Sequence, residues 1–264
     1  MALNDAQVAQ AADILAAAFR GRTTIDDLPV ECGPSNAAEA VQVQIALLDR
    51  LGLDAAGYKA GFTNPPMLEK AGRDGPMAGV MFRDFTVASG GTLQRADFGP
   101  GTLVEAEVSF CMGADLPARD GGYTVDEVLG AVDSAIIGIE MAVPRMNDPL
   151  NQPMVHLAAD NGAAMGFVAG PDIPHWRERE LKTLDIELLF DGKQVSEGMP
   201  LPARCDEVWS VAWIVNHFSA RGVGIKAGDY LTTGAAAVPK PLGGAKDVTA
   251  RFAGIGDVQV TIEG

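Results

Sequence analysis

The spacing of apolar residues near the start of the chain is that of two α-helices. Residues 4–20 repeat apolar side chains every three or four positions, beginning at an asparagine or aspartate N-cap. Ser35 is expected to cap a second helix that runs to about Leu51 and ends at Gly52. We therefore expect residues 1–56 to form a small N-terminal helical segment.

Further along the chain the pattern changes to short apolar runs between glycine- and proline-rich turns, which is typical of β-strands. Strands are expected at 57–63, 79–82, 85–88, 103–110, 134–143, 165–168, 184–190, 230–233, 248–252 and 258–262. A helix is expected from Thr124, which begins a capping-box pattern, and another over 206–221. The stretch 144–162 is expected to be irregular. The chain is thus predicted to have an α+β fold, in which residues 57–264 form one β-rich catalytic domain.

The strand expected at 103–110 carries two carboxylates on one face. Side chains alternate along a strand, so Glu105 and Glu107 point the same way while their apolar neighbours point into the core. A solvated polar face would explain this pair alone, but a third acid, Glu140, lies in the apolar strand at 134–143. Three neighbouring carboxylates repel one another unless they share protons or a cation. The set predicts an all-oxygen site for Mg²⁺ or Mn²⁺.

Composition and charge narrow the classes of function. The chain has 264 residues, is 47% hydrophobic and carries a formal net charge of −15, which indicates a globular protein without nucleic acid or an anionic membrane as partner. The first residues lack the features of a signal peptide, and no apolar run could span a bilayer. The cysteines are odd in number and widely spaced, so we expect free thiols and a cytoplasmic location.

Other candidates for chemistry lie elsewhere on strands and loops. Lys59, with glycines two residues to either side, could approach a bound carboxylate or exchange a proton; the alternative is a surface lysine on an edge strand. Arg73 and Arg145 are loop arginines that could hold a substrate carboxylate bidentately, although most such residues are solvated. Asp160 lies in a turn-like Asp-Asn-Gly sequence, where a role in the site stays open. Thr233 precedes a loop of small residues whose N–H groups could meet an anion.

Taken together, these stretches resemble the fumarylacetoacetate hydrolase superfamily. Within it they are most similar to the branch of 2-oxopent-4-enoate (2-hydroxypentadienoate) hydratases and 4-oxalocrotonate decarboxylases. The matching stretches are GYKAGFT at 57–63, EAE at 105–107, IE at 139–140 with Arg145, ADN at 159–161, AWIVN at 212–216 with Gly222, AGDYLTTG at 227–234 and FAGIGDV at 252–258. The Glu-x-Glu strand with the distant Glu140 is the most specific of these signals.

The resemblance implies a fold, a cofactor and an activity. The implied fold is a mixed β-roll, a barrel-like sheet with peripheral helices, and the enzymes of this family are usually homo-oligomers. In the family the three acids hold Mg²⁺ or Mn²⁺ and the strand lysine acts in the pocket, which gives these roles to Glu105, Glu107, Glu140 and Lys59. The implied substrate is a small 2-oxo acid. A 2-hydroxy-2,4-dienoate (2-oxo-4-enoate) would be hydrated to a 4-hydroxy-2-oxo acid, as in the meta-cleavage degradation of aromatic compounds.

The chain departs from the hydratase pattern at three places. Met77 stands where hydratases carry an acid, Ala163 stands where they carry a serine, and 204–208 replaces a Gly-His-Pro segment. The first departure removes a proton-transfer partner for Lys59 and brings the chain closer to the decarboxylases. Decarboxylation of a 2-oxo-3-enedioate therefore stays an alternative. Two further alternatives are C–C bond hydrolysis of an acylpyruvate-type substrate and a non-catalytic homologue that acts as a partner.

Overall fold

The structure is a computed structural model that describes residues 2–64, 68–69, 75–149 and 151–264. Its helices are α1 (Asp5–Gly21), α2 (Ala37–Leu51), α4 (Val125–Gly130), α5 (Met154–Ala159) and α6 (Glu207–Ser219), and a 3₁₀ turn, η3 (Asn161–Ala163), follows α5. Its strands are β1 (Ala55–Gly61), β2 (Met77–Phe82), β3 (Thr86–Ala88), β4 (Gly91–Gln94), β5 (Leu103–Met112), β6 (Val132–Ala142), β7 (Gly166–Asp172), β8 (Ile186–Phe190), β9 (Lys193–Glu197), β10 (Tyr230–Thr232), β11 (Lys240–Pro241), β12 (Asp247–Phe252) and β13 (Gly256–Glu263). None of the helices within the described ranges combines the length and the apolarity that crossing a membrane requires.

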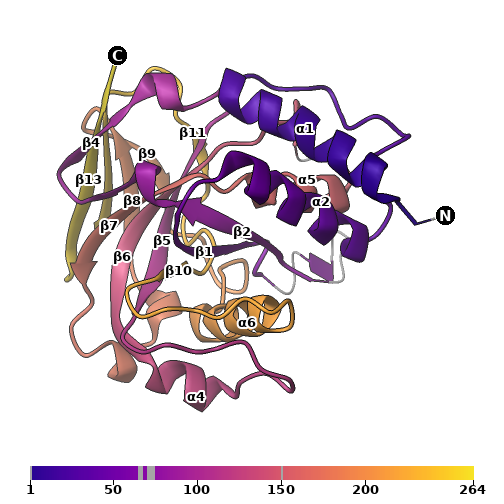
Figure 1. Cartoon of the computed structure of the whole chain (residues 1–264). Coiled ribbons are helices and arrows are strands. Elements are labelled where there is room, and N and C mark those ends of the chain that lie inside the picture. The colour runs from indigo at the N-terminus through magenta and orange to yellow at the C-terminus, as the bar shows by residue number, and fades with distance from the viewer. Residues whose placement is uncertain (1, 65–67, 70–74, 150) are drawn as a thin grey trace.

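Two sheets form the body of the molecule, with helices at its periphery (Figure 1). The larger sheet has the strand order β2-β1-β10-β5-β6-β7-β3, and β11 pairs with β5. Most neighbours in it are antiparallel, but β1 runs parallel to β10 and β3 runs parallel to β7. The smaller sheet has the order β4-β13-β12-β8-β9. The larger sheet is curled, with β5 and β6 among its central strands. This is the barrel-like sheet that the resemblance implies.

The outer face of the curled sheet supplies the main apolar core. Val104 and Val108 of β5 and Ile139 of β6 are fully buried in one cluster with Leu188 of β8 and Val260 of β13. Each such side chain contributes about 1.5–3 kcal/mol of hydrophobic stabilisation when it leaves water. Because side chains alternate along β5, this packing forces the intervening glutamates onto the opposite, inner face.

The second predicted helix begins one residue later than expected. Asn36, not Ser35, is the N-cap of α2, because its side chain accepts a hydrogen bond from the Glu39 N–H at 3.1 Å. Ser35 instead donates its backbone N–H and its hydroxyl to the Glu39 carboxylate, at 2.7 and 2.9 Å. Both residues therefore support the start of the helix, and composition alone does not say which one adopts the cap geometry.

Part of the segment 144–162, which is predicted to be irregular, is helical. Helix α5 lies within it, turn η3 begins in it, and Pro153 precedes α5 at the N-cap position. A helix of 6 residues is too short to show a helical period in the sequence. The sequence analysis also does not predict β4 or β9, which have 4 and 5 residues. The prediction of an irregular segment is thus wrong for α5.

The N-terminal helices pack on α5 and lie over β2 (Figure 1). Leu15 of α1, Leu47 of α2 and Ala159 of α5 are fully buried in a second apolar cluster. Helices α1 and α2 therefore share a core with an element that lies more than a hundred positions further along the sequence. The predicted boundary between residues 1–56 and 57–264 stays a prediction.

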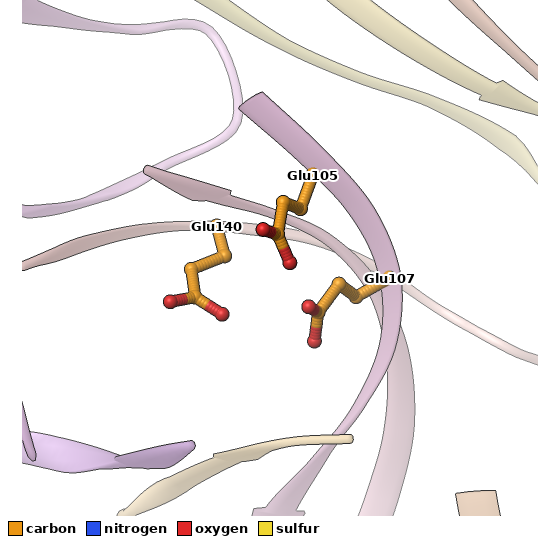
Figure 2. A group of neighbouring side chains, drawn as sticks. All are labelled: Glu105, Glu107 and Glu140. Carbon is orange, nitrogen blue, oxygen red and sulfur yellow. The ribbon is translucent and has the colours of Figure 1, made fainter. Parts of the chain in front are cut away.

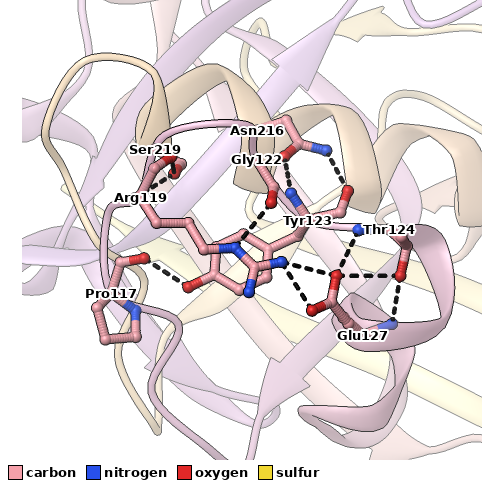
Figure 3. A network of polar contacts seen from close by, with 8 residues as sticks. All are labelled: Pro117, Arg119, Gly122, Tyr123, Thr124, Glu127, Asn216 and Ser219. Atoms are coloured by element: carbon pink, nitrogen blue, oxygen red, sulfur yellow. Dashed lines mark hydrogen bonds and ion pairs between the residues drawn. The ribbon is translucent and has the colours of Figure 1, made fainter.

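Arg119 joins the loop before α4 to that helix (Figure 3). Its guanidinium donates to both carboxylate oxygens of Glu127 at 2.7 Å, and its Cζ lies 3.7 Å from the centroid of the Tyr123 ring. Glu127 also completes a capping box with Thr124, and Asn216 of α6 bonds both the N–H and the carbonyl of Tyr123. The hydrogen bonds from Arg119 and from the Thr124 N–H lower the pKa of Glu127 to about 2.

The ion pair of Glu127 predicts a pH dependence of stability. The pKa of Glu127 is lower in the folded chain than the ordinary value of 4.5, so its stabilisation is complete above 4.5 and is lost as the pH falls towards 2. Glu127→Gln keeps a capping-box residue and removes the charge. We expect this variant to be less stable than the wild type above pH 4.5, with the difference shrinking in acid, as measured by urea unfolding. Both side chains are partly exposed, so the difference is small and falls with added salt.

The control for this measurement is Asp126→Asn, which removes a charge from the exposed neighbouring position in the first turn of α4. An identical pH dependence in the two variants would show that the helix dipole, and not the pair with Arg119, accounts for the effect.

Candidate metal centre

Three glutamates from β5 and β6 meet on the inner face of the larger sheet (Figure 2). Antiparallel pairing sets Glu105 opposite Glu140, and Glu107 follows two positions later on the same face of β5. Each residue offers one carboxylate oxygen, and these oxygens lie within 4.8 Å of one another. The alternation along β5, together with the pairing to β6, thus brings the three predicted acids together.

Two of the three carboxylates are short of hydrogen-bond partners. Glu107 and Glu140 are fully buried, and Glu107 Oε1 and Glu140 Oε2 accept no hydrogen bond from any residue that the structure describes. Burial, followed by repulsion from Glu140, raises the pKa of Glu105 to about 7, and burial with repulsion from both neighbours raises the pKa of Glu107 well above its ordinary value. A divalent cation would fill the open lone pairs and oppose this repulsion. Three carboxylates fit a cation that prefers oxygen ligands, such as Mg²⁺ or Mn²⁺.

Lys59 brings a positive charge to the three glutamates. Its Nζ lies 3.2 Å from Glu140 Oε1, and its side chain is only 4% exposed. Burial by itself lowers the pKa of Lys59, but attraction by the three carboxylates outweighs burial and the pKa is raised. Strand β1 lies between β2 and β10, so the alternative of a surface lysine on an edge strand is wrong. The lysine is therefore a charged, buried partner of Glu140.

The loop after β10 orients Glu107 from the other side. The Gly234 N–H donates to Glu107 Oε2 at 2.9 Å. Gly234 has a φ of 108°, and a Cβ at this position would lie 2.1 Å from Thr63 Oγ1, so only glycine fits. The anion that meets this loop is thus a carboxylate of the protein itself. Thr233 directs its hydroxyl to the Val108 carbonyl at 2.7 Å, and its contact with a substrate stays a prediction.

Asp160 and Arg145 form an ion pair in the interior. Arg145 Nε lies 3.5 Å from Asp160 Oδ1, and the Arg145 N–H donates to Oδ2 at 2.8 Å. The guanidinium also donates to the carbonyls of Val143 and Ala164, at 2.5 and 3.1 Å. Burial raises the pKa of Asp160 to about 6 and lowers that of Arg145. These contacts are all internal and join the end of β6 to η3, while a role of either side chain in substrate binding stays a prediction.

Met77 borders the same space as the Lys59 ammonium group. A Cβ built on Gly61 would lie 3.5 Å from Lys59 Nζ and 3.6 Å from Met77 Cε. Met77 is buried, so an apolar methyl group stands near the lysine where hydratases carry an acid. Ala163, the second departure, ends η3. Arg73 falls outside the described residues.

Two residues that support the site are not predicted as site residues. Cys205 is buried and donates to the Gly234 carbonyl at 3.3 Å, so it contacts the residue that orients Glu107. Asn161, which belongs to the ADN stretch of the resemblance, bonds both the N–H and the carbonyl of Val80 in β2. The partner of Asn161 lies 81 positions away, and the thiol belongs to no motif. Only the folded chain shows these contacts.

Two enzymes are similar in sequence to this chain over most of its length. No family model matches the chain. A 2-keto-4-pentenoate hydratase from Burkholderia vietnamiensis is 26% identical over 261 residues, which is 98% of both sequences. A 4-oxalocrotonate decarboxylase from Pseudomonas sp. strain CF600 is 26% identical over 221 residues, which is 83% of this chain and 82% of that protein.

Solved structures share the fold. The 4-oxalocrotonate decarboxylase from Pseudomonas putida G7, complexed with magnesium and adipate, has a TM-score of 0.84 and 24% identity over 98% of both chains. A fumarylacetoacetate hydrolase family protein from Yersinia pestis CO92 has a TM-score of 0.55 and 16% identity, over 78% of this chain and 91% of that one. The chain thus has the fold of the fumarylacetoacetate hydrolase type, and the predicted fold class is confirmed. Its relatives by sequence are hydratases and decarboxylases, which confirms the predicted resemblance to this branch.

Removal of one glutamate charge should abolish tight metal binding at this centre. We expect Glu107→Gln to weaken Mn²⁺ binding by about 100-fold or more, because the loss of supporting groups around metal ligands alone costs about 10- to 100-fold. Isothermal titration of the metal-free protein measures the affinity. Mn²⁺ should also raise the melting temperature of the wild type and not that of the variant.

Glu197→Gln is the matched control, because Glu197 lies exposed on β9 of the other sheet. Equal Mn²⁺ affinity in the Glu107→Gln and Glu197→Gln proteins would refute a metal site at the three glutamates.

Proposed function

We propose that this chain is a divalent-metal-dependent lyase that hydrates a 2-hydroxy-2,4-dienoate (2-oxo-4-enoate) to a 4-hydroxy-2-oxo acid. The observation that carries the proposal is the trio of neighbouring glutamates beside Lys59, two of which are buried and have oxygens without a hydrogen-bond partner among the described residues. A 2-oxo acid presents a carboxylate and a keto oxygen side by side, which suits a cation held on one face and a lysine next to it. The name of the hydratase relative supports the reaction, and the magnesium complex of the decarboxylase supports the cofactor.

The residues of the chain divide the task between holding a cation and handling a proton. Glu105, Glu107 and Glu140 would hold the cation, which when bound supplies Lewis-acid polarisation of the 2-oxo group. The Gly234 N–H keeps Glu107 in place before and after binding. Lys59 holds the substrate carboxylate or moves a proton, and its burial shields that proton from bulk water. The net reaction adds one water, with its hydroxyl at C4 of the substrate.

Decarboxylation of a 2-oxo-3-enedioate is the second candidate, and the position of Met77 favours it. Hydration needs a proton on one carbon and a hydroxyl on another, so an acid near Lys59 would assist it. Decarboxylation needs only that the electron pair left by CO₂ be accepted by the polarised 2-oxo group. The apolar Met77 methyl group, which borders the same glycine as the Lys59 ammonium group, supplies no such acid, and the 2-oxo group that accepts the electron pair does not depend on it.

The remaining assignments are also proposals. We propose Mg²⁺ or Mn²⁺ as the ion, a small 2-oxo acid as the substrate and a homo-oligomer as the assembled form. Cys32, Cys111 and Cys205 are unpaired, which supports the predicted reducing, cytoplasmic location.

A direct assay separates the two candidates. We expect the wild-type protein with Mg²⁺ or Mn²⁺ to consume 2-hydroxypenta-2,4-dienoate and form the 4-hydroxy-2-oxo acid. The loss of dienoate absorbance measures this reaction. Release of CO₂ from 2-oxohex-3-enedioate, without hydration of the dienoate, would assign the decarboxylase instead. No turnover of either substrate by protein that binds Mn²⁺ would overturn both assignments.

Substitution of Met77 tests whether the missing acid limits hydration. We expect Met77→Asp to raise the rate of hydration relative to decarboxylation by about 10-fold or more, because a positioned acid or base contributes roughly 10²–10⁴-fold. The matched control is Met77→Asn, because asparagine is polar and close to aspartate in size but has no titratable group. An equal change of the rate ratio in both variants would show that polarity or packing, not proton transfer, is responsible.

A further inference from the structure

Strand β2, which pairs with the lysine strand, lies at the end of the larger sheet. Its pairing with β1 sets Gly79 opposite Lys59. A strand at the end of a sheet leaves backbone N–H and C=O groups unpaired along its outer side. Every residue of β2 is buried, so these groups cannot turn to water and need partners within the protein.

Asn161 acts as a substitute for the absent neighbouring strand. Its Oδ1 accepts from the Val80 N–H and its Nδ2 donates to the Val80 carbonyl, both at 2.9 Å. Asn161 has a φ of 54°, a left-handed conformation that asparagine tolerates better than most residues. The turn lies so close to β2 that a Cβ on Gly79 would be 2.2 Å from the Asn161 carbonyl oxygen. Asn161 therefore packs directly against β2 at Gly79, the residue opposite Lys59.

Gln44 of α2 completes this contact from the N-terminal segment. It is 5% exposed, and its Nε2 donates to the Ala78 carbonyl at 3.0 Å and to Asn161 Oδ1 at 3.1 Å. The second bond requires the oxygen of the Asn161 amide to face Gln44. Only this orientation also lets Asn161 accept from the N–H of Val80 and donate to its carbonyl. Gln44 thus adds a hydrogen bond that supports the amide orientation set by Val80, and it also satisfies the Ala78 carbonyl on the outer edge of β2.

We propose that Gln44 is a positioning residue for Lys59: from α2 it closes the free edge of β2 through Asn161 and so holds the β1–β2 pair in place. The N-terminal helical segment then takes part in the site without contacting the substrate. The proposal concerns the site of the proposed function and rests on that function only for its kinetic measurements.

Two substitutions at position 44 remove the contact without a large change of volume. Gln44→Met keeps an unbranched side chain of similar size and deletes both donated hydrogen bonds. Gln44→Glu keeps the shape but sets a carboxylate against two oxygen acceptors, Ala78 O and Asn161 Oδ1, which is more severe. The matched control is Gln42→Met, at an exposed position of the same helix.

The first measurement is independent of any reaction. We expect hydrogen exchange of peptides that cover β1 and β2 to accelerate in Gln44→Met, with peptides from β12 and β13 of the other sheet unchanged. Gln42→Met should match the wild type throughout. Acceleration of equal size in both sheets would mean general destabilisation and would overturn the proposal, as would unchanged exchange at β2.

The second measurement is kinetic. A displacement of about 1 Å in a reacting group can cost on the order of 100-fold in rate, so we expect kcat of Gln44→Met to fall by about 10-fold or more. Mn²⁺ affinity should stay within about 2-fold, because the three glutamates lie on β5 and β6. KM should stay within about 2-fold where Lys59 moves a proton, and should rise where Lys59 holds the substrate carboxylate. A fall in Mn²⁺ affinity equal to the fall in kcat would show a structural role only and would contradict positioning of Lys59.

The two proposals fail separately. Selective exchange at β1 and β2 in a protein without turnover would support the role of Gln44 and overturn the proposed reaction. Turnover that is unaffected in Gln44→Met, with unchanged exchange, would overturn the role of Gln44 and leave the reaction standing. If Gln44→Met does not fold, Gln44→Asn, which keeps the amide but shortens the side chain, gives the same two readouts.

Discussion

Repulsion among three neighbouring carboxylates, two of them fully buried, is the constraint on which the rest of this structure depends. The glutamates are brought within 4.8 Å of one another on strands whose other face is core, so they cannot separate without unpacking that face. Lys59 supplies one positive charge and the Gly234 N–H supplies one hydrogen bond, yet oxygens of Glu107 and Glu140 keep open lone pairs. A protein that keeps such a cluster gives up stability, which a divalent cation restores when it binds. The metal-free glutamate cluster destabilises the folded protein, and metal binding would offset that cost. This is the reason to assign the cluster a function.

The sequence predicts the part of this site that depends on alternation along single strands. Glu105 and Glu107 share a face because β5 is regular, and the apolar neighbours of Glu140 exclude a surface position. The curled sheet itself follows from the resemblance to a known family, and not from periodicity. Helix boundaries are predicted to within a residue or so where glycine ends them, as at Gly52 of α2. Ser35 and Asn36 are both polar residues that could cap α2. Which of them does so depends on backbone angles that the sequence does not determine.

Contacts between distant segments are the part that the sequence cannot supply. The 3.2 Å approach of Lys59 to Glu140 requires β1, β10, β5 and β6 to be neighbours in that order, which no local pattern encodes. Asn161 has the composition of a turn, and its two bonds to Val80 depend on a left-handed backbone pressed against β2. The prediction of short elements such as α5 fails for a related reason. Six residues are too few to show a helical period, and the helix is stabilised by its packing against distant segments.

The proposed metal centre would suit both candidate reactions. The three glutamates lie on the inner face of the curl (Figure 2), Lys59 lies 3.2 Å from Glu140, and the Gly234 N–H donates to Glu107. A cation held there beside one positive group is what both candidate reactions need. The difference between the reactions lies in the supply of a proton, and protons come from groups at the border of the site. Met77, at the start of β2, borders the same glycine as Lys59 and lies on neither strand that carries the glutamates. We therefore expect a substitution there to change the proton supply without a change in the repulsion among the carboxylates, which lie on β5 and β6. On this proposal the specificity changes at β2, the end strand of the larger sheet, while β5 and β6, which carry the glutamates, stay the same.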